Sequence, residues 1–317
     1  MARSTACASE PAARSRAGSL GSRLAGRLAT QAAIVTLPMS RTHNEPSIAW
    51  ICATCGVEHA DCSGVCAICS DERQWVPADG QRWTTLEELE RAGHRTSVVE
   101  LEHSLLGITV KPTVGIGQQA HLVVTPAGNL LWDPTGYLDD NAVSGVLSRG
   151  EVVAIAASHP HMFGAQVEWS RALGDVPVLV SEPDMGWIGR PDPLIQSWRG
   201  RHEIATGLTL HQLGGHFPGS AIVHWAAGSM GRGVLLVSDT IHVNPDRATV
   251  TFLRSYPNRI PLSATVALRL AEAIEPLTYE RIYDNFGHTI NSDAPAAVRR
   301  SADRYAAWAR GELDNLT

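Results

Sequence analysis

The alternation of apolar and polar positions along the chain predicts a layered arrangement of strands and helices. Three strand-like runs fall between residues 97 and 133, SVVELEH, LGITVKPTV and AHLVVTPAGNLLWD, and the turn signal TPAGN splits the last run into a hairpin. Further strands are predicted at 151–157 and in the runs VPVLVS, LTLHQL, AIVHWAA, GVLLVSD, TVTFLRSYPN and YERIYD. Helices are predicted at 84–92, 138–148, 164–173, 263–274 and 293–312, and a Pro-, Gly- and Trp-rich loop at 182–200. Strands that alternate with helices indicate an α/β domain built around a layered sheet.

Composition separates the first 45 residues from the rest of the chain. The chain has 317 residues, of which 44% are hydrophobic, so it can build one large domain and a smaller one. Residues 1–45 are rich in Ala, Arg, Ser and Gly and nearly free of acidic side chains. We expect a disordered or mis-started N-terminal tail, with the true start at Met39 in the second case, and a transit peptide is a further alternative.

The charge and hydropathy of the chain argue against two classes of partner. The formal charge is −6, and residues 1–41 hold six arginines and one glutamate, a charge of +5, which leaves −11 for the remainder. Because surfaces that bind nucleic acid are basic, we expect no nucleic-acid partner for the folded part. No apolar run approaches the roughly 20 residues of a membrane-spanning helix, so we also expect no membrane segment.

A dense cysteine cluster predicts a small metal-binding element. Five of the six cysteines lie in CATCGVEHADCSGVCAIC, where two Cys-x2-Cys knuckles are separated by ten residues. Thiolates at this spacing suit tetrahedral Zn²⁺, which predicts a zinc ribbon over residues 46–80 with the ligands Cys52, Cys55, Cys66 and Cys69. His59 or Cys62 could substitute as a ligand. The alternative, two disulfides, requires an oxidising compartment that nothing else in the chain indicates, so we expect a cytoplasmic protein.

Polar side chains follow directly after four apolar strands of the large domain. Asp133 follows NLLW, His159 and His161 lie in the turn SHPHMFG after VVAIAA, His216 lies in GGHFPGS, and Asp239 follows GVLLVS. Because strand ends meet at one edge of a sheet, these side chains are candidates for a single site. Each has a simpler explanation alone, since an HxH pair arises by chance, GGHFPGS can be a plain turn and an Asp can cap a helix. Four further histidines fall in strands and are expected in the core or on a sheet face: His121, His211, His224 and His242.

This order of strand-end Asp, HxH turn, GGHFPGS and strand-end SD resembles the metallo-β-lactamase superfamily over about residues 97–290. The chain is more specifically similar to a little-characterised bacterial group in that superfamily, whose members join an N-terminal zinc ribbon and CxICxDERQ(Y/W)V to a domain with SHPH and GGHFPG. The resemblance implies an αββα sandwich over residues 81–317, preceded by a small zinc ribbon with four cysteine ligands. It also implies a metal bound along one edge of the sheets.

The resemblance assigns roles to individual residues and shows one departure. His159, His161 and His216 would bind the first metal, and Asp239 would ligate or bridge it. Asp133 would organise the turn, and His288, in YDNFGHTI, would be the last metal histidine. The superfamily turn reads HxHxDH, but Phe163 and Gly164 stand where the Asp and His of a second metal site are expected. A complete two-zinc site is therefore not expected.

Two functions follow from this pattern. In the first, a single zinc held by three histidines and Asp239 activates water, and the protein is a hydrolase of a small molecule; Asp239 is the catalytic candidate, and Asp184 and Glu182 are alternative bases. Three tryptophans are candidates to line a substrate pocket: Trp169, Trp187 and Trp198. In the second, the incomplete motif marks a catalytically degenerate binding or interaction module with a structural zinc ribbon. The intact set of three histidines and Asp239 favours the hydrolase.

Overall fold

Two mixed β-sheets form the centre of the domain in the computed structural model, which describes residues 48–317. The first sheet has the strand order β10-β9-β8-β7-β6-β5-β4, with β4 Arg95–Glu102, β5 Leu105–Lys111, β6 Ala120–Val123, β7 Asn129–Trp132, β8 Val152–Ala156, β9 Val178–Ser181 and β10 Ile195–Trp198. The second has the order β11-β12-β13-β14-β19-β20, with β11 Arg201–Ala205, β12 Leu208–Gln212, β13 Ala221–Trp225, β14 Val234–Leu236, β19 Arg281–Tyr283 and β20 Thr289–Ile290. The N-terminal tail predicted at 1–45 lies outside the described residues.

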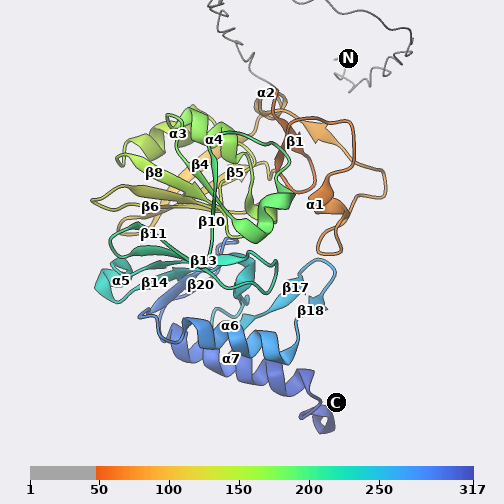
Figure 1. The fold of residues 1–317 in the computed structure, drawn as a ribbon, viewed down its shortest axis with the longest axis vertical. Helices are drawn as coiled ribbons and strands as arrows, with labels where there is room; N and C mark the ends of the chain where they lie inside the picture. The colour runs from red at the N-terminus through yellow and green to blue at the C-terminus, as the bar shows by residue number, and fades with distance from the viewer. Residues whose placement is uncertain (1–47) are drawn as a thin grey trace, which may run out of the picture. The chain divides into compact units, whose positions relative to one another are not determined.

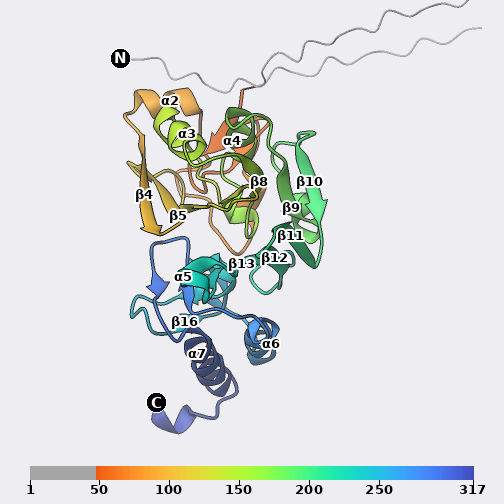
Figure 2. The same ribbon diagram turned by 90° about the vertical axis from the view of Figure 1, so that its left-hand side faces the viewer.

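Helices cover the outer face of each sheet, which makes four layers (Figures 1 and 2). On the first sheet lie α3 Asp140–Leu147 and α4 Gln166–Ala172, and on the second lie α6 Ala264–Ile274 and α7 Ala294–Ala309. Each helix buries an apolar stripe against its sheet, so each outer layer has its own hydrophobic core. A third core, which includes Trp132, Val223 and Leu236, fills the space between the sheets. This arrangement confirms the predicted αββα sandwich.

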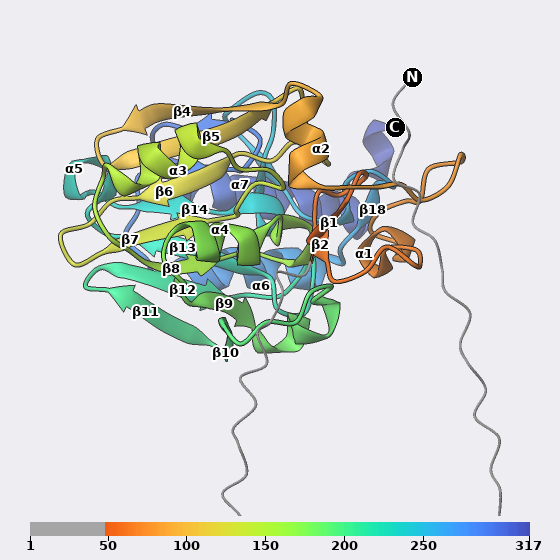
Figure 3. The ribbon, with the colours of Figure 1, turned by 90° about the horizontal axis from the view of Figure 1, so that it is seen from above.

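The cysteine-rich segment forms a small element at one end of the sandwich (Figure 3). It contains a three-stranded sheet of order β2-β1-β3, with β1 Trp50–Cys52, β2 Glu58–His59 and β3 Trp83–Thr84, and the short helix α1 Ala67–Ser70. Its Ile51 and Val57 share one hydrophobic cluster with Phe163 and Trp169 of the large domain. The domain boundary predicted at residues 80/81 stays a prediction, and β3 lies just beyond it.

The predicted helices are confirmed with their ends shifted by at most three residues. Thr85 caps α2 Leu86–Arg91 by accepting a hydrogen bond from the Glu88 amide, as the Thr and Glu spacing indicates. Ser263 caps α6 in the same way. Among the described residues, no helix combines the length and apolar composition that a membrane crossing requires.

Two predictions along the chain were wrong in detail. The predicted loop 182–200 contains the edge strand β10, whose partly exposed sequence IQSW has no apolar run to mark it. The predicted strand TVTFLRSYPN is two short strands, β16 Val250–Thr251 and β17 Leu253–Ser255, which pair with β15 His242–Val243 and β18 Ile260–Pro261. Each half therefore has a different partner, which local sequence does not indicate.

Candidate metal centres

Four cysteine sulfurs converge in the small N-terminal element. The Sγ atoms of Cys52 and Cys69 are 3.6 Å apart and those of Cys55 and Cys66 are 3.7 Å apart. A disulfide bond measures about 2 Å, whereas four thiolates around one Zn²⁺ at about 2.3 Å each lie about 3.8 Å from one another. All four thiols are free and buried, so this set fits a tetrahedral metal rather than two disulfides.

The neighbours of this cluster are polar groups directed at sulfur. His59 Nε2 lies 3.4 Å from Cys66 Sγ, and the Gln81 amide donates to Cys52 Sγ at 3.1 Å. Such donors stabilise thiolates and orient them. Among the described residues, the set whose ligand atoms converge here contains the four predicted cysteines, and His59 lies beside it as a hydrogen-bonding neighbour.

The turn after β8 brings two histidines into the domain interior. His159 is extended, with φ −169° and ψ 172°, as the following proline favours, and Pro160–Met162 form a short 3-10 turn that reverses the chain. The Asp133 carboxylate at the end of β7 accepts a hydrogen bond from the Ser158 amide at 2.6 Å, and Asp133 itself has φ +54°. Asp133 thus fixes the backbone that carries His159, the organising role predicted for it.

The loop between β12 and β13 supplies the third histidine. His216 follows Gly214 and Gly215, both with positive φ, so the chain turns sharply before it enters β13. The Nδ1 atom of His216 lies 3.0 Å from the Leu253 carbonyl oxygen. A carbonyl can only accept, so Nδ1 carries the proton and the Nε2 lone pair is free to bind an ion.

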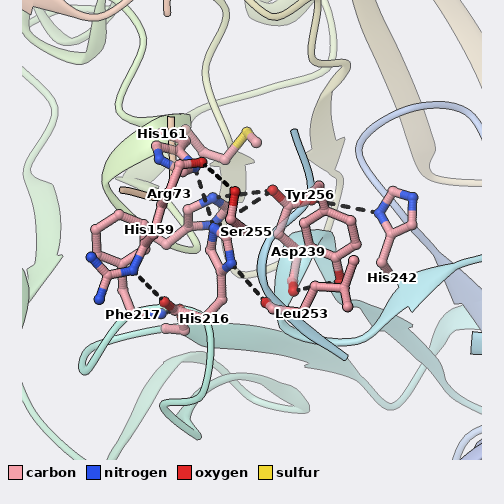
Figure 4. Close-up of polar contacts among 12 residues, drawn as sticks. Arg73, His159, His161, His216, Phe217, Asp239, His242, Leu253, Ser255 and Tyr256 are labelled. Atoms are coloured by element: carbon pink, nitrogen blue, oxygen red, sulfur yellow. Dashed lines mark hydrogen bonds and ion pairs between the residues drawn. The ribbon is translucent and has the colours of Figure 1, made fainter. Parts of the chain in front are cut away.

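Asp239 completes this set from the end of β14 (Figure 4). Its Oδ2 atom lies 3.5 Å from His159 Nε2 and 3.8 Å from His216 Nε2. His216 Nε2 is in turn 3.3 Å from His161 Nδ1. The four predicted residues therefore gather from the ends of three strands, β8, β12 and β14, and their side chains are almost completely buried.

Protonation favours metal binding by these side chains. Burial lowers the pKa of His216 to about 3 and holds that of His161 well below its ordinary value, so both rings are neutral at pH 7. Burial raises the pKa of the Asp239 carboxyl, but its neighbours His159 and His242 lower it further, and the net pKa lies well below the ordinary value. Neutral imidazoles beside an ionised carboxylate are the donor forms that a divalent metal requires.

One donor atom of this set lacks a hydrogen-bond partner. Among the described residues, His159 Nε2, which faces Asp239 Oδ2, is buried without such a partner. Buried polar atoms of this kind are costly unless something satisfies them. Bonds of about 2.1 Å to a tetrahedral metal place donor atoms about 3.4 Å apart, and the separations here are 3.3 to 3.8 Å. The donor set fits a single divalent metal.

A second set of three side chains lies next to the first. It consists of His242 in β15, Asp284 after β19 and His288 before β20, whose ligand atoms converge. His288 was predicted as a ligand, and it belongs to this second set rather than to the histidines around His216. Sequence reasoning missed the other two members, since His242 was expected on a strand face. The only sequence signal for it is the spacing SDTIH, which puts His242 three residues after Asp239.

Phe163 and Gly164 have clear structural roles at the positions that depart from the superfamily turn. Phe163 is 2% exposed and packs in the hydrophobic cluster shared with the ribbon. Gly164 has φ +53°, and a Cβ atom there would lie 2.1 Å from the Pro134 carbonyl oxygen, so a histidine does not fit. The Gly164 carbonyl accepts a hydrogen bond from the Glu58 amide of the ribbon at 3.0 Å. This part of the turn serves to dock the ribbon.

The other sequence candidates lie near the site, at the surface or in the core. Asp184 is buried and accepts a hydrogen bond from the Gly219 amide, whereas Glu182 is half-exposed and pairs with Arg199. Trp187 packs edge-on against Phe217, which follows His216. Trp169 and Trp198 lie in hydrophobic clusters of the sandwich, so the structure does not support a pocket role for these two tryptophans.

Comparisons with known proteins support the αββα fold. No family model matches the chain. The "Uncharacterized protein YmaE" of Bacillus subtilis (strain 168) is 41% identical over 269 residues, which is 83% of this chain and 98% of that protein. The crystal structure of DIM-1 metallo-β-lactamase matches with a TM-score of 0.52 and 10% identity, covering 68% of this chain and 98% of that one. The structure of VMB-1 at pH 5.5 matches with a TM-score of 0.51 and 10% identity over the same shares. At this identity the structural matches show a common fold.

Proposed function

Because this chain belongs to the family of the Bacillus subtilis protein YmaE and has the metallo-β-lactamase fold, we propose that it is a metal-dependent hydrolase of a small molecule. The observation that carries the proposal is the convergence of the buried side chains of His159, His161, His216 and Asp239, in which His159 Nε2 has no hydrogen-bond partner. Three imidazoles and a carboxylate are typical zinc ligands, so we propose zinc both here and in the ribbon. Bound zinc would supply Lewis acidity, which activates water and polarises a carbonyl or phosphoryl oxygen.

The protein side chains would prepare this chemistry in distinct ways. The three imidazoles are held in place by neighbours, as the bond between His216 and the Leu253 carbonyl illustrates. Asp239 would serve both as a ligand and as the acceptor that orients the attacking water, since its two carboxylate oxygens face different neighbours. We assign the catalytic role to Asp239 for this reason.

Exposure suggests the side from which a substrate would enter. The side chains of the first set are at most 6% exposed, whereas His242 and His288 are 16% and 28% exposed. Phe286, at 36% exposure, packs beside His242 and offers an apolar edge. A substrate would therefore reach the centre past His288 and Phe286, and the negative charge of the folded part favours a small molecule over nucleic acid. A metal bound by reduced cysteines is consistent with the cytoplasmic location that we propose.

A panel of ester, thioester and phosphodiester substrates tests the hydrolase, each assayed with and without a chelator. We expect turnover of at least one class, its loss on chelation, and its return when zinc is added. The His159→Ala/His161→Ala variant should lose both this activity and its metal, while the ribbon metal remains. A metal-loaded protein that is silent across the panel would favour the binding-module function instead.

A further inference from the structure

The set of His242, Asp284 and His288 has the geometry of a second metal site. Asp284 Oδ2 lies 3.1 Å from His288 Nδ1 and 4.0 Å from His242 Nδ1. His242 Nδ1 is also 3.5 Å from Asp239 Oδ1. Bonds of about 2.1 Å to one ion would place such donors about 3.4 Å apart, so small adjustments bring the atoms of His242, Asp284 and His288 into one coordination sphere, beside which Asp239 Oδ1 lies.

Within this set His288 Nδ1 and Asp284 Oδ2 are at hydrogen-bond distance, 3.1 Å, but the contacts of His242 Nδ1 are longer. Among the described residues, His242 Nδ1 and Asp239 Oδ1 are buried atoms without a hydrogen-bond partner, although they face each other. Asp239 is itself only 5% exposed. A separation of 3.5 to 4.0 Å is long for a hydrogen bond but normal for two ligands of one ion. The unsatisfied atoms thus point to a cation between them.

The backbone around Asp284 holds its carboxylate in a ligand orientation. Asp284 Oδ1 accepts hydrogen bonds from the amides of Phe286 at 2.9 Å and His288 at 2.8 Å. These two bonds fix one oxygen in the turn and leave Oδ2 directed at the histidines. An orienting contact of this kind is usual behind a metal-binding carboxylate.

Asp239 connects the two sets. Its Oδ2 atom faces His159 and His216, and its Oδ1 atom faces His242. A carboxylate that directs one oxygen to each of two donor sets is the arrangement of a bridging ligand in two-metal sites, where the ions lie about 3.5–4 Å apart.

We propose that His242, Asp284 and His288 bind a second divalent metal, which shares the Asp239 carboxylate with the first. His242 and Asp284 come from segments after β14 and β19, so this site does not use the turn in which Phe163 and Gly164 stand. Phe163 and Gly164, which contact the ribbon, therefore need not supply metal ligands, because the donors come from other segments of the chain. The inference goes beyond the proposed function, which needs only one metal in this domain. With a second metal bound, Asp239 Oδ1 would be a ligand of that metal and would no longer orient the attacking water.

Metal content of the full-length protein tests the proposal. Purified in the presence of zinc, the wild type should contain three metals per chain, and His242→Ala/His288→Ala should contain two. The matched control is His211→Ala/His224→Ala, a histidine pair on β12 and β13 outside both sets, which should keep three. Anomalous scattering from crystals should show two peaks about 3.5–4 Å apart at Asp239. A wild type with two metals, or a double variant that retains three, would overturn the proposal.

A single variant guards against misfolding of the double variant, and metal counting distinguishes failure of this proposal from failure of the hydrolase proposal. If the double variant does not fold, His288→Gln replaces the most exposed ligand alone and should weaken binding of the third metal at least tenfold in a chelator competition. Unchanged affinity in this variant would also overturn the proposal. Metal counting does not depend on activity, so three metals without any hydrolysis would contradict the hydrolase and leave the second site standing.

Discussion

Gly164 occupies a position where backbone geometry strongly disfavours any residue with a Cβ atom. Its φ of +53° lies in the left-handed region, and a Cβ atom would meet the Pro134 carbonyl at 2.1 Å. We expect Gly164→Ala to destabilise the protein by about 2–5 kcal/mol, from about 1–2 for the left-handed conformation and about 1–3 for the clash. Urea unfolding of the metal-loaded protein measures this difference.

Gly174→Ala is the matched control for that measurement. Gly174 also has a positive φ, +96°, but nothing lies within 4 Å of its Cβ position. It should therefore show only the conformational cost of about 1–2 kcal/mol. If both variants lose the same stability, the close contact with Pro134 does not constrain the turn.

His121, buried in β6, should make stability depend on pH. Burial lowers its pKa from 6.5 to about 4. The unfolded chain therefore binds a proton as pH falls below 6.5, while the folded protein does not until pH approaches 4. Stability attributable to this residue should be lost over that window, up to about 3 kcal/mol.

The variant His121→Gln isolates this contribution. Its free energy of unfolding should fall less than that of the wild type between pH 7 and pH 5, measured by urea titration at each pH. All other histidines are the same in both proteins, so the difference between the two pH profiles reports His121. Parallel profiles would mean that His121 does not remain neutral in the folded state.

At the scale of elements, the β17–β18 hairpin links the ribbon to the first metal set. Asn258 lies in the turn of this hairpin, and its side-chain amide donates to the carbonyls of Glu72 at 2.8 Å and Gln74 at 3.0 Å. The same hairpin carries the Leu253 carbonyl that orients His216. Asn258→Ala should destabilise the protein by about 1–3 kcal/mol and weaken metal binding at the first set by about 10-fold or more.

Asn141→Ala provides the comparison for Asn258→Ala. The Asn141 amide also bridges two acceptors, the carbonyl and the hydroxyl of Thr96, but it lies on α3. This variant should lose some stability without any change in metal affinity, as measured by competition with a fluorescent chelator. Equal affinities in the two variants would show that the hairpin does not orient His216.

Local sequence predicted the long elements and the strand-end side chains that converge in the first set, but not the short strands near the site. Capping residues and apolar runs mark α2, α6 and β8, because these signals lie within a few neighbouring residues. A two-residue strand such as β15, which carries His242, has no periodicity to detect. Asp284 is oriented by a backbone amide in its own turn. Its neighbour His242 lies far earlier in the sequence, so the contact between them depends on the tertiary fold.

At the scale of the whole molecule, the ribbon braces the first metal set through Arg73. This residue is buried, donates from Nε to the His216 carbonyl at 2.7 Å, and lies 4.1 Å above the Phe217 ring. Its own carbonyl accepts a hydrogen bond from the Ser255 hydroxyl of β17 (Figure 4). The segment just after the cysteine cluster therefore forms part of the wall around the histidines.

Loss of the ribbon metal should consequently weaken the distant metal set. In Cys52→Ser/Cys69→Ser the ribbon metal is lost, and because metal supplies most of the folding energy of so small an element, its Arg73 segment should loosen. We expect affinity at the His159, His161 and His216 set to fall about 10- to 100-fold. Arg73→Ala, with all cysteines intact, should reproduce this fall while the ribbon metal is retained, both measured by chelator competition and metal analysis. If Arg73→Ala leaves the affinity unchanged, any effect of the cysteine variant must pass through other contacts, such as the bond from Glu58 to Gly164.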